Sequence, residues 1–125
     1  MKKLWRFLPA LLVMAVIFAF SSVPKQEMPN FGLVDLFVKK GGHVLGYALL
    51  ALAYWYGLSA IPSGSTTRPY FQAYILSALY AISDEFHQSF VPGRHATWVD
   101  ALIIDGSGAI LALGLVYWLR AKKKM

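Results

Sequence analysis

Two short stretches of the sequence carry side chains that could transfer protons or bind an anion. The run SDEFHQSFVPGR, residues 83–94, contains two carboxylates, an imidazole, an amide and a guanidinium. The run KKGGHVLGY, residues 39–47, adds two ammonium groups, a second imidazole and a phenol. Carboxyl and imidazole groups act as general acids and bases, and guanidinium or ammonium groups can hold a phosphate. We therefore predict one polar site to which both stretches contribute.

Helical spacing groups these side chains into two faces. Residues three and four positions apart lie on the same side of a helix. This spacing gives one face on each of two helices: Lys40, His43 and Tyr47 on the first, and Asp84, His87 and Gln88 on the second. Ionisable groups at membrane depth usually face the interior of a bundle and mark a functional site. We expect the two faces to meet.

Four stretches of the chain are long and apolar enough to be the helices that position this site: residues 4–20, 43–61, 70 to about 87, and about 101 to 119. A helix needs about 20 residues to cross roughly 30 Å of hydrocarbon. The composition agrees, since 58% of the residues are hydrophobic and only 14% are charged. We predict an all-α fold, an integral membrane bundle of four transmembrane helices, with residues 1–125 forming a single domain.

The charged residues orient this bundle. Basic residues concentrate in cytoplasmic segments of membrane proteins. Both ends of the chain and the loop between the second and third stretches contain basic residues and no acidic one: Lys2, Lys3, Arg6, Arg68, Arg120, Lys122, Lys123 and Lys124. The acidic residues fall on or near the other side: Glu27, Asp35, Asp84, Glu85, Asp100 and Asp105. We predict that both termini are cytoplasmic and that the polar site lies at the outer face.

The first apolar stretch has a second interpretation. A basic start, an apolar core and small residues after it are also features of a secretory signal. Residues 4–20 form a long apolar run without a clean small-x-small cleavage site, so we favour a retained span. Cleavage would leave three spans in the same orientation.

Structural roles are the alternative for several of the polar residues. Asp84 or Glu85 could form an ion pair with Arg94 or Lys40 that fastens the outer loop to the bundle. The histidines near this loop, His87 and His95, could bind headgroups or water at the interface. The glycines of the second and fourth stretches are expected to permit close helix approach: Gly41, Gly42, Gly46, Gly106, Gly108 and Gly114.

A metal site is a further alternative. His43, Asp84, Glu85 and His87 offer the imidazole and carboxylate ligands that suit zinc, manganese or iron. The chain has no HExxH motif and no paired Glu-x-x-His motif, so we predict no metal and no cofactor. The absence of cysteine also excludes disulfides, thiolate catalysis and zinc held by sulfur. The net charge of +6 lies in the flanking segments without a nucleic-acid-binding pattern, so we predict no nucleic-acid partner.

The motifs together resemble those of the VanZ-like family of small membrane proteins. The resemblance covers about residues 39 to 114 and consists of K-x-x-H-x-x-x-Y from Lys40, D-E-x-x-Q from Asp84, P-G-R ending at Arg94, and D-x-x-G from Asp105 after Asp100. It implies these functional positions: Lys40, His43, Tyr47, Asp84, Glu85, Gln88, Arg94, Asp100, Asp105 and Gly108.

The same resemblance implies a multi-pass protein of the cytoplasmic membrane of a bacterium. The family is named for a cell-envelope protein associated with resistance to the glycopeptide antibiotic teicoplanin. Two features depart from the family pattern. Asp105 stands where Asn is often expected, and its spacing from Asp100 turns the two side chains about 140° apart on a helix. His87 is not a recognisable family position.

Two kinds of function fit these residues, and the sequence leaves both open. In the first, the protein is an enzyme acting on a lipid or a lipid-linked cell-wall precursor, with Arg94 and Lys40 holding a phosphate, Glu85 or Asp84 as general base and His43 as acid. In the second, the polar site binds membrane lipid headgroups or the antibiotic without catalysis. A transporter is less favoured, because four short spans leave little room for a pathway unless the protein forms a homo-oligomer.

Overall fold

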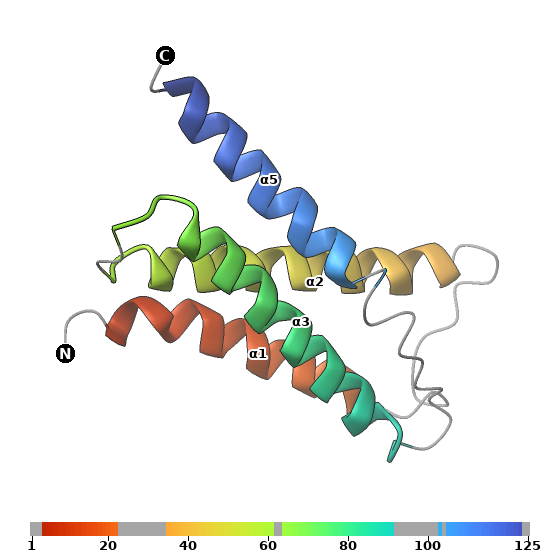
Figure 1. Ribbon diagram of the computed structural model, residues 1–125. Coiled ribbons are helices and arrows are strands. Elements are labelled where there is room, and N and C mark those ends of the chain that lie inside the picture. Colours follow the sequence, from red (N-terminus) through yellow and green to blue (C-terminus); the bar gives the residue numbers. More distant parts are fainter. Residues whose placement is uncertain (1–3, 23–34, 62–63, 92–102, 104, 124–125) are drawn as a thin grey trace.

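The structure, a computed structural model, describes residues 4–22, 35–61, 64–91, 103 and 105–123, and every element in these ranges is helical (Figure 1). A short 3-10 helix, η1 (Leu4–Phe7), leads into α1 (Leu8–Ser21). The remaining helices are α2 (Asp35–Leu58), α3 (Arg68–Gln88) and α5 (Gly106–Lys123). The prediction of an all-α fold with four long helices is therefore confirmed.

The helix bounds follow from the local sequence. α1 and α3 each have proline in the first turn, where its missing N–H leaves no intrahelical bond unmade. α2 begins at Asp35, ahead of the predicted start at His43, and α5 runs past the predicted end through Arg120, Lys122 and Lys123. Lysine and arginine are good helix formers and favour the last turn, where they face the negative end of the helix dipole.

None of the helices in the described ranges combines the length and the apolar character needed to cross a membrane. The four transmembrane spans and the cytoplasmic termini thus stay predictions.

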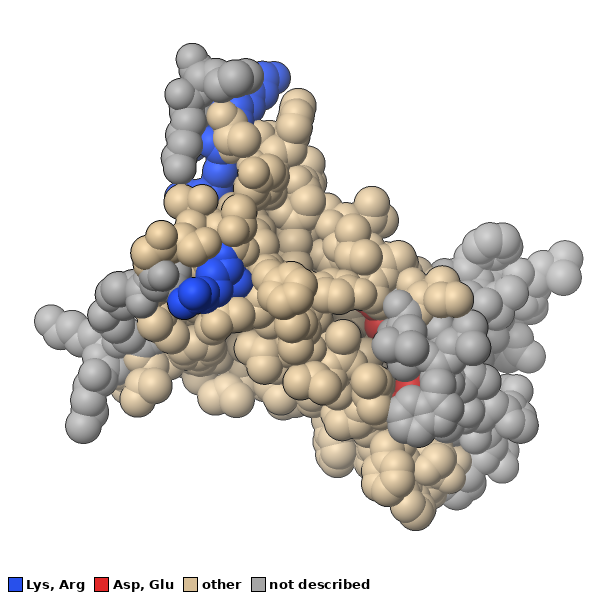
Figure 2. Space-filling view, in the orientation of Figure 1, with Lys and Arg blue, Asp and Glu red and all other residues tan. Residues whose placement is uncertain are grey.

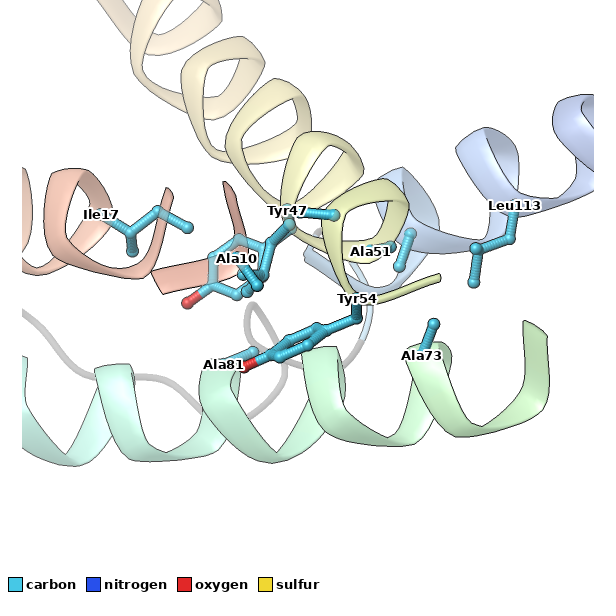
Figure 3. Close-up of a cluster of buried hydrophobic side chains, with 11 residues drawn as sticks. Ala10, Ile17, Tyr47, Ala51, Tyr54, Ala73, Ala81 and Leu113 are labelled. Atoms are coloured by element: carbon cyan, nitrogen blue, oxygen red, sulfur yellow. The ribbon is translucent and has the colours of Figure 1, made fainter. Parts of the chain in front are cut away.

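α2 is the central helix of the fold. It contacts η1, α1, α3 and α5, and α5 crosses it at a steep angle (Figure 1). Its buried side chains, Tyr47, Leu50, Ala51 and Tyr54, recur at helical spacing. Figure 3 shows Tyr47 and Tyr54 reaching toward α1 and α3, while Ala51 lies beside α5. One buried cluster therefore joins all four helices.

Two tyrosines fasten α1 to its neighbours through a single residue, Met14. The Tyr80 hydroxyl of α3 donates a hydrogen bond to the Met14 carbonyl oxygen at 2.7 Å. The Tyr54 hydroxyl of α2 contacts the Met14 sulfur at 3.1 Å. A buried phenol needs such a partner, since an unpaired hydroxyl costs free energy in an apolar interior.

Small residues on α3 let it approach α2 closely. Ala73, Ser77 and Ala81 are buried and stand four residues apart, so they form one stripe along the helix. The stripe continues into the buried polar residues Glu85 and, one position over, Asp84. The packing of α3 thus carries these carboxylates into the interior of the bundle.

Gly108 sets the separation of α2 and α5. A Cβ atom at this position would lie 2.3 Å from the Val44 carbonyl oxygen and 3.1 Å from its carbonyl carbon. Only glycine fits so close to a neighbouring backbone. Val44 follows His43, and Asp105 lies about one turn before Gly108, so this contact brings Asp105 to His43.

Candidate functional site

Asp84 is the centre of a buried hydrogen-bond network between α2 and α3. Its Oδ2 atom accepts a hydrogen bond from the Tyr47 hydroxyl at 3.1 Å and another from Gln88 Nε2 at 3.2 Å. Tyr47 is 1% exposed, Asp84 4% and Gln88 5%. A carboxylate removed from water to this degree is costly unless donors compensate it. The phenol and the amide supply that compensation.

His43 and Asp105 form a second pair beside this network. His43 Nδ1 lies 3.6 Å from Asp105 Oδ1, which is an ion-pair distance for a protonated imidazole and longer than a hydrogen bond. The His43 ring is nearly parallel to the Tyr47 ring, with an angle of 8° and centroids 6.5 Å apart. The Asp84 network and the His43–Asp105 pair are therefore neighbours. They meet at one face of α2, the face that the sequence predicted His43 and Tyr47 to share.

The His43 pair reaches the edge of the bundle. The His43 side chain is 33% exposed, whereas that of Asp105 is 4% exposed. A buried carboxylate beside one ring nitrogen can orient an imidazole, as in many proton-transfer sites. The partly exposed imidazole is therefore a candidate general acid or base.

Glu85 is also buried, 5% exposed, on α3 next to Asp84. The described part of the site therefore contains three buried carboxylates, those of Asp84, Glu85 and Asp105, together with His43, Tyr47 and Gln88. All six are residues that the sequence had selected.

Three predicted site residues lie beyond what the structure describes. Arg94 and Asp100 fall in residues 92–102, outside the described ranges, and for Lys40 only the helical backbone is described. The role of Lys40 and Arg94 in holding a phosphate stays a prediction, as does a site shared by Asp100 and Asp105.

His87 lies apart from the network that its spacing suggested. Its Nε2 atom is 2.9 Å from the Ser22 hydroxyl, and its ring stacks on Phe18 with centroids 4.4 Å apart. His87 thus packs against the end of α1 instead of joining Asp84 and Gln88. Among the described residues, no group of three or more histidine, aspartate and glutamate side chains is placed to hold a metal ion.

Tyr80 is a neighbour of the site that the sequence did not single out. Its ring centroid is 6.3 Å from that of Tyr47, and its hydroxyl binds α1. Tyr80 stands four residues before Asp84, so it shares that face of α3. That spacing was the signal that could have identified it.

Comparison with known proteins supports the assignment that the motifs suggested. Searches among curated proteins and among solved structures gave no significant match. The family model described as VanZ/LLP1 matches residues 6–120, which include α1, α2, α3, most of α5 and every site residue described above. The chain therefore belongs to the VanZ/LLP1 family.

Proposed function

We propose that this protein is a multi-pass protein of a bacterial cytoplasmic membrane whose polar site receives the head of a lipid or a lipid-linked cell-wall precursor and acts on it by acid–base chemistry. Both termini are cytoplasmic in this proposal, and the site opens toward the outer face.

The distribution of polar and apolar side chains supports the membrane location. Large hydrophobic side chains are exposed along α1 and α5, among them Leu11, Leu12, Leu111 and Leu115. The acidic side chains that the structure describes are buried instead. In water this arrangement would expose apolar surface and desolvate charge, both of which cost free energy. In hydrocarbon it is the favourable one.

The basic residues support the orientation. Figure 2 shows Lys and Arg gathered over the end of α5 and beside the start of α3, whereas Asp and Glu appear only as small areas on the opposite side of this face. This separation agrees with a cytoplasmic basic side.

The single observation that carries the proposed chemistry is the His43–Asp105 pair, in which a partly exposed imidazole lies beside a buried carboxylate at the edge of the bundle. In the proposal, Asp105 orients His43, which exchanges a proton with the ligand. The hydrogen bonds of Asp84 hold Tyr47 and Gln88 in place, and Lys40 and Arg94 receive the phosphate of the ligand.

The test is mass spectrometry of total lipids, including polyprenyl-linked species, from cells expressing the wild type or Asp105→Asn at matched levels. We expect at least one lipid species to change with the wild type and to stay unchanged with the variant. Gln72→Ala, which alters an exposed polar residue of α3, is the matched control and should behave as wild type. Full lipid turnover by Asp105→Asn would exclude the acid–base mechanism.

A second candidate function is binding without catalysis, as the family's association with teicoplanin resistance suggests. The observation in its favour is that the two described donors to Asp84, a phenol and an amide, are neutral and buried, which is typical of a structural network. Unchanged lipid profiles together with a retained effect on teicoplanin susceptibility would favour this function.

A further inference from the structure

A pocket of about 320 Å³ lies where the end of α2, the start of α3 and the end of α5 meet. It is separate from the candidate site, because Trp55 in its wall is about 18 Å along α2 from His43 at 1.5 Å per residue. We propose that this pocket binds a phosphate group, that of an anionic phospholipid headgroup at the cytoplasmic face.

The cation of this pocket is Arg120. Its guanidinium lies over the Trp55 ring, 5.3 Å from the centroid. Within the part of the chain that the structure describes, no carboxylate pairs with Arg120, and the buried acidic residues lie near the end of α3 and just before α5, far from Arg120 in both helices. A guanidinium offers five N–H donors in a plane that matches phosphate oxygens. An external anion is therefore the natural counter-ion of Arg120.

The Trp55 ring that faces this guanidinium belongs to a wall of three aromatic rings. Trp55 of α2 contacts Tyr70 of α3 with centroids 5.5 Å apart, and Tyr70 contacts Tyr117 of α5 edge to face at 5.4 Å. The rings come from three helices, so the wall exists only in the folded bundle. A preorganised cation loses less conformational entropy on binding than a mobile one.

The remaining lining supplies hydroxyl groups. Ser59 donates to the Trp55 carbonyl oxygen, and Ser65 accepts from the backbone N–H of Arg68, so these two hydroxyls brace the helix ends. Thr66 lines the same pocket on the side of the α3 N-terminus. The positive end of the α3 dipole points in this direction and adds to the attraction for an anion.

The mixed lining favours a lipid as the source of the phosphate. Aromatic rings and Pro69 form an apolar wall next to the arginine and the hydroxyls. A phospholipid has the same sequence of groups, a phosphate followed by glycerol and acyl chains. This choice of source rests on the membrane location proposed above, whereas the binding of phosphate itself does not.

The experiment is native mass spectrometry of the full-length protein in a nonionic detergent containing equal amounts of phosphatidylglycerol and phosphatidylcholine. We expect the wild type to retain phosphatidylglycerol about tenfold better, because the choline ammonium of phosphatidylcholine offsets the negative charge of its phosphate. Arg120→Gln should abolish the preference. Lys122→Gln is the matched control, because Lys122 lies on the same helix over another tryptophan, Trp118, and does not line the pocket.

Two further measurements separate a pocket from diffuse charge attraction. Ala121→Phe keeps every charge but fills the pocket, so it should also lower the preference. Equal losses in Arg120→Gln and Lys122→Gln, with no loss in Ala121→Phe, would overturn the proposal. Displacement of the lipid by inorganic phosphate at equal concentration would overturn the lipid source and leave free phosphate as the ligand.

The lipid preference of this pocket does not depend on the chemistry of the candidate site around His43 and Asp105. Asp105→Asn should bind phosphatidylglycerol as the wild type does, even if it abolishes lipid turnover. A failure of either proposal is therefore distinguishable from a failure of the other.

Discussion

At the scale of single residues, the buried carboxylate of Asp84 depends on its donors. Tyr47 and Gln88 both bond to the same oxygen, so the loss of either one removes one of the two hydrogen bonds that the described residues donate to this buried carboxyl group. Tyr47 is also stacked with His43, and this makes it the residue that connects the two parts of the candidate site.

We predict that Tyr47→Phe destabilises the protein by about 1–3 kcal/mol, because the change removes a hydrogen bond to a buried charge and keeps the ring. The measurement is the midpoint of thermal unfolding of the purified protein. Tyr56→Phe, at an exposed tyrosine of the same helix, should leave the midpoint unchanged. If the two variants lose equal stability, the network is not the cause. In an Asp84→Asn background the Tyr47→Phe change should cost less, because no charge is left unpaired.

Residue types and helical spacing were enough to predict the contact face shared by His43 and Tyr47, and the pairing of Asp84 with Gln88. They misplaced His87, because periodicity tells which residues share a side of a helix but not which neighbouring helix covers that side. The contact of His87 with Ser22 and Phe18 depends on the end of α1 lying beside the end of α3. No local pattern encodes that proximity.

At the scale of helices, close approach depends on particular glycines. From the sequence, six glycines were equally good candidates for positions of close helix packing. The structure distinguishes them, since a Cβ at Gly108 would collide with the α2 backbone, while Gly41, Gly42 and Gly114 have no described atom within 4 Å of that position. Which glycine is needed follows from the crossing point of two helices, and that point is a tertiary property.

Gly108→Ala should cost about 1–3 kcal/mol, because the new methyl group meets the rigid Val44 carbonyl and forces α2 and α5 apart. Gly114→Ala, six residues later in the same helix, should be neutral or stabilising by up to about 1 kcal/mol through its helix propensity. Thermal unfolding of both variants is the measurement. If Gly114→Ala lost as much stability, the effect would come from glycine replacement anywhere in α5 and not from the contact with Val44. Gly108→Ala should also lower the activity of the site, because Asp105 moves with α5.

At the scale of the whole molecule, the apolar stretches predicted the four long helices that the described ranges contain, and the motifs predicted the family. The pocket at the basic end was not foreseen. Its aromatic wall combines Trp55, Tyr70 and Tyr117, which are far apart in the chain, and sequence spacing relates residues only within one helix.

The proposed topology can be tested by labelling single cysteines, since the chain contains none of its own. Ser89→Cys lies just past α3, and Thr66→Cys lies between α2 and α3; both positions are exposed. A membrane-impermeant maleimide should label Ser89→Cys in intact cells and Thr66→Cys only after permeabilisation. The reverse pattern would invert the orientation, and labelling of both in intact cells would contradict a membrane-spanning bundle.

The contacts of Met14 have a consequence for the order in which the protein assembles during synthesis. α1 leaves the ribosome first, but its hydrogen-bond partner Tyr80 is 66 residues downstream and Tyr54 is 40 residues downstream. α1 therefore waits for α2 and then for α3 before its inner face is fully covered. A chaperone or insertase that shields this face would act in the interval between the synthesis of Met14 and that of Tyr80.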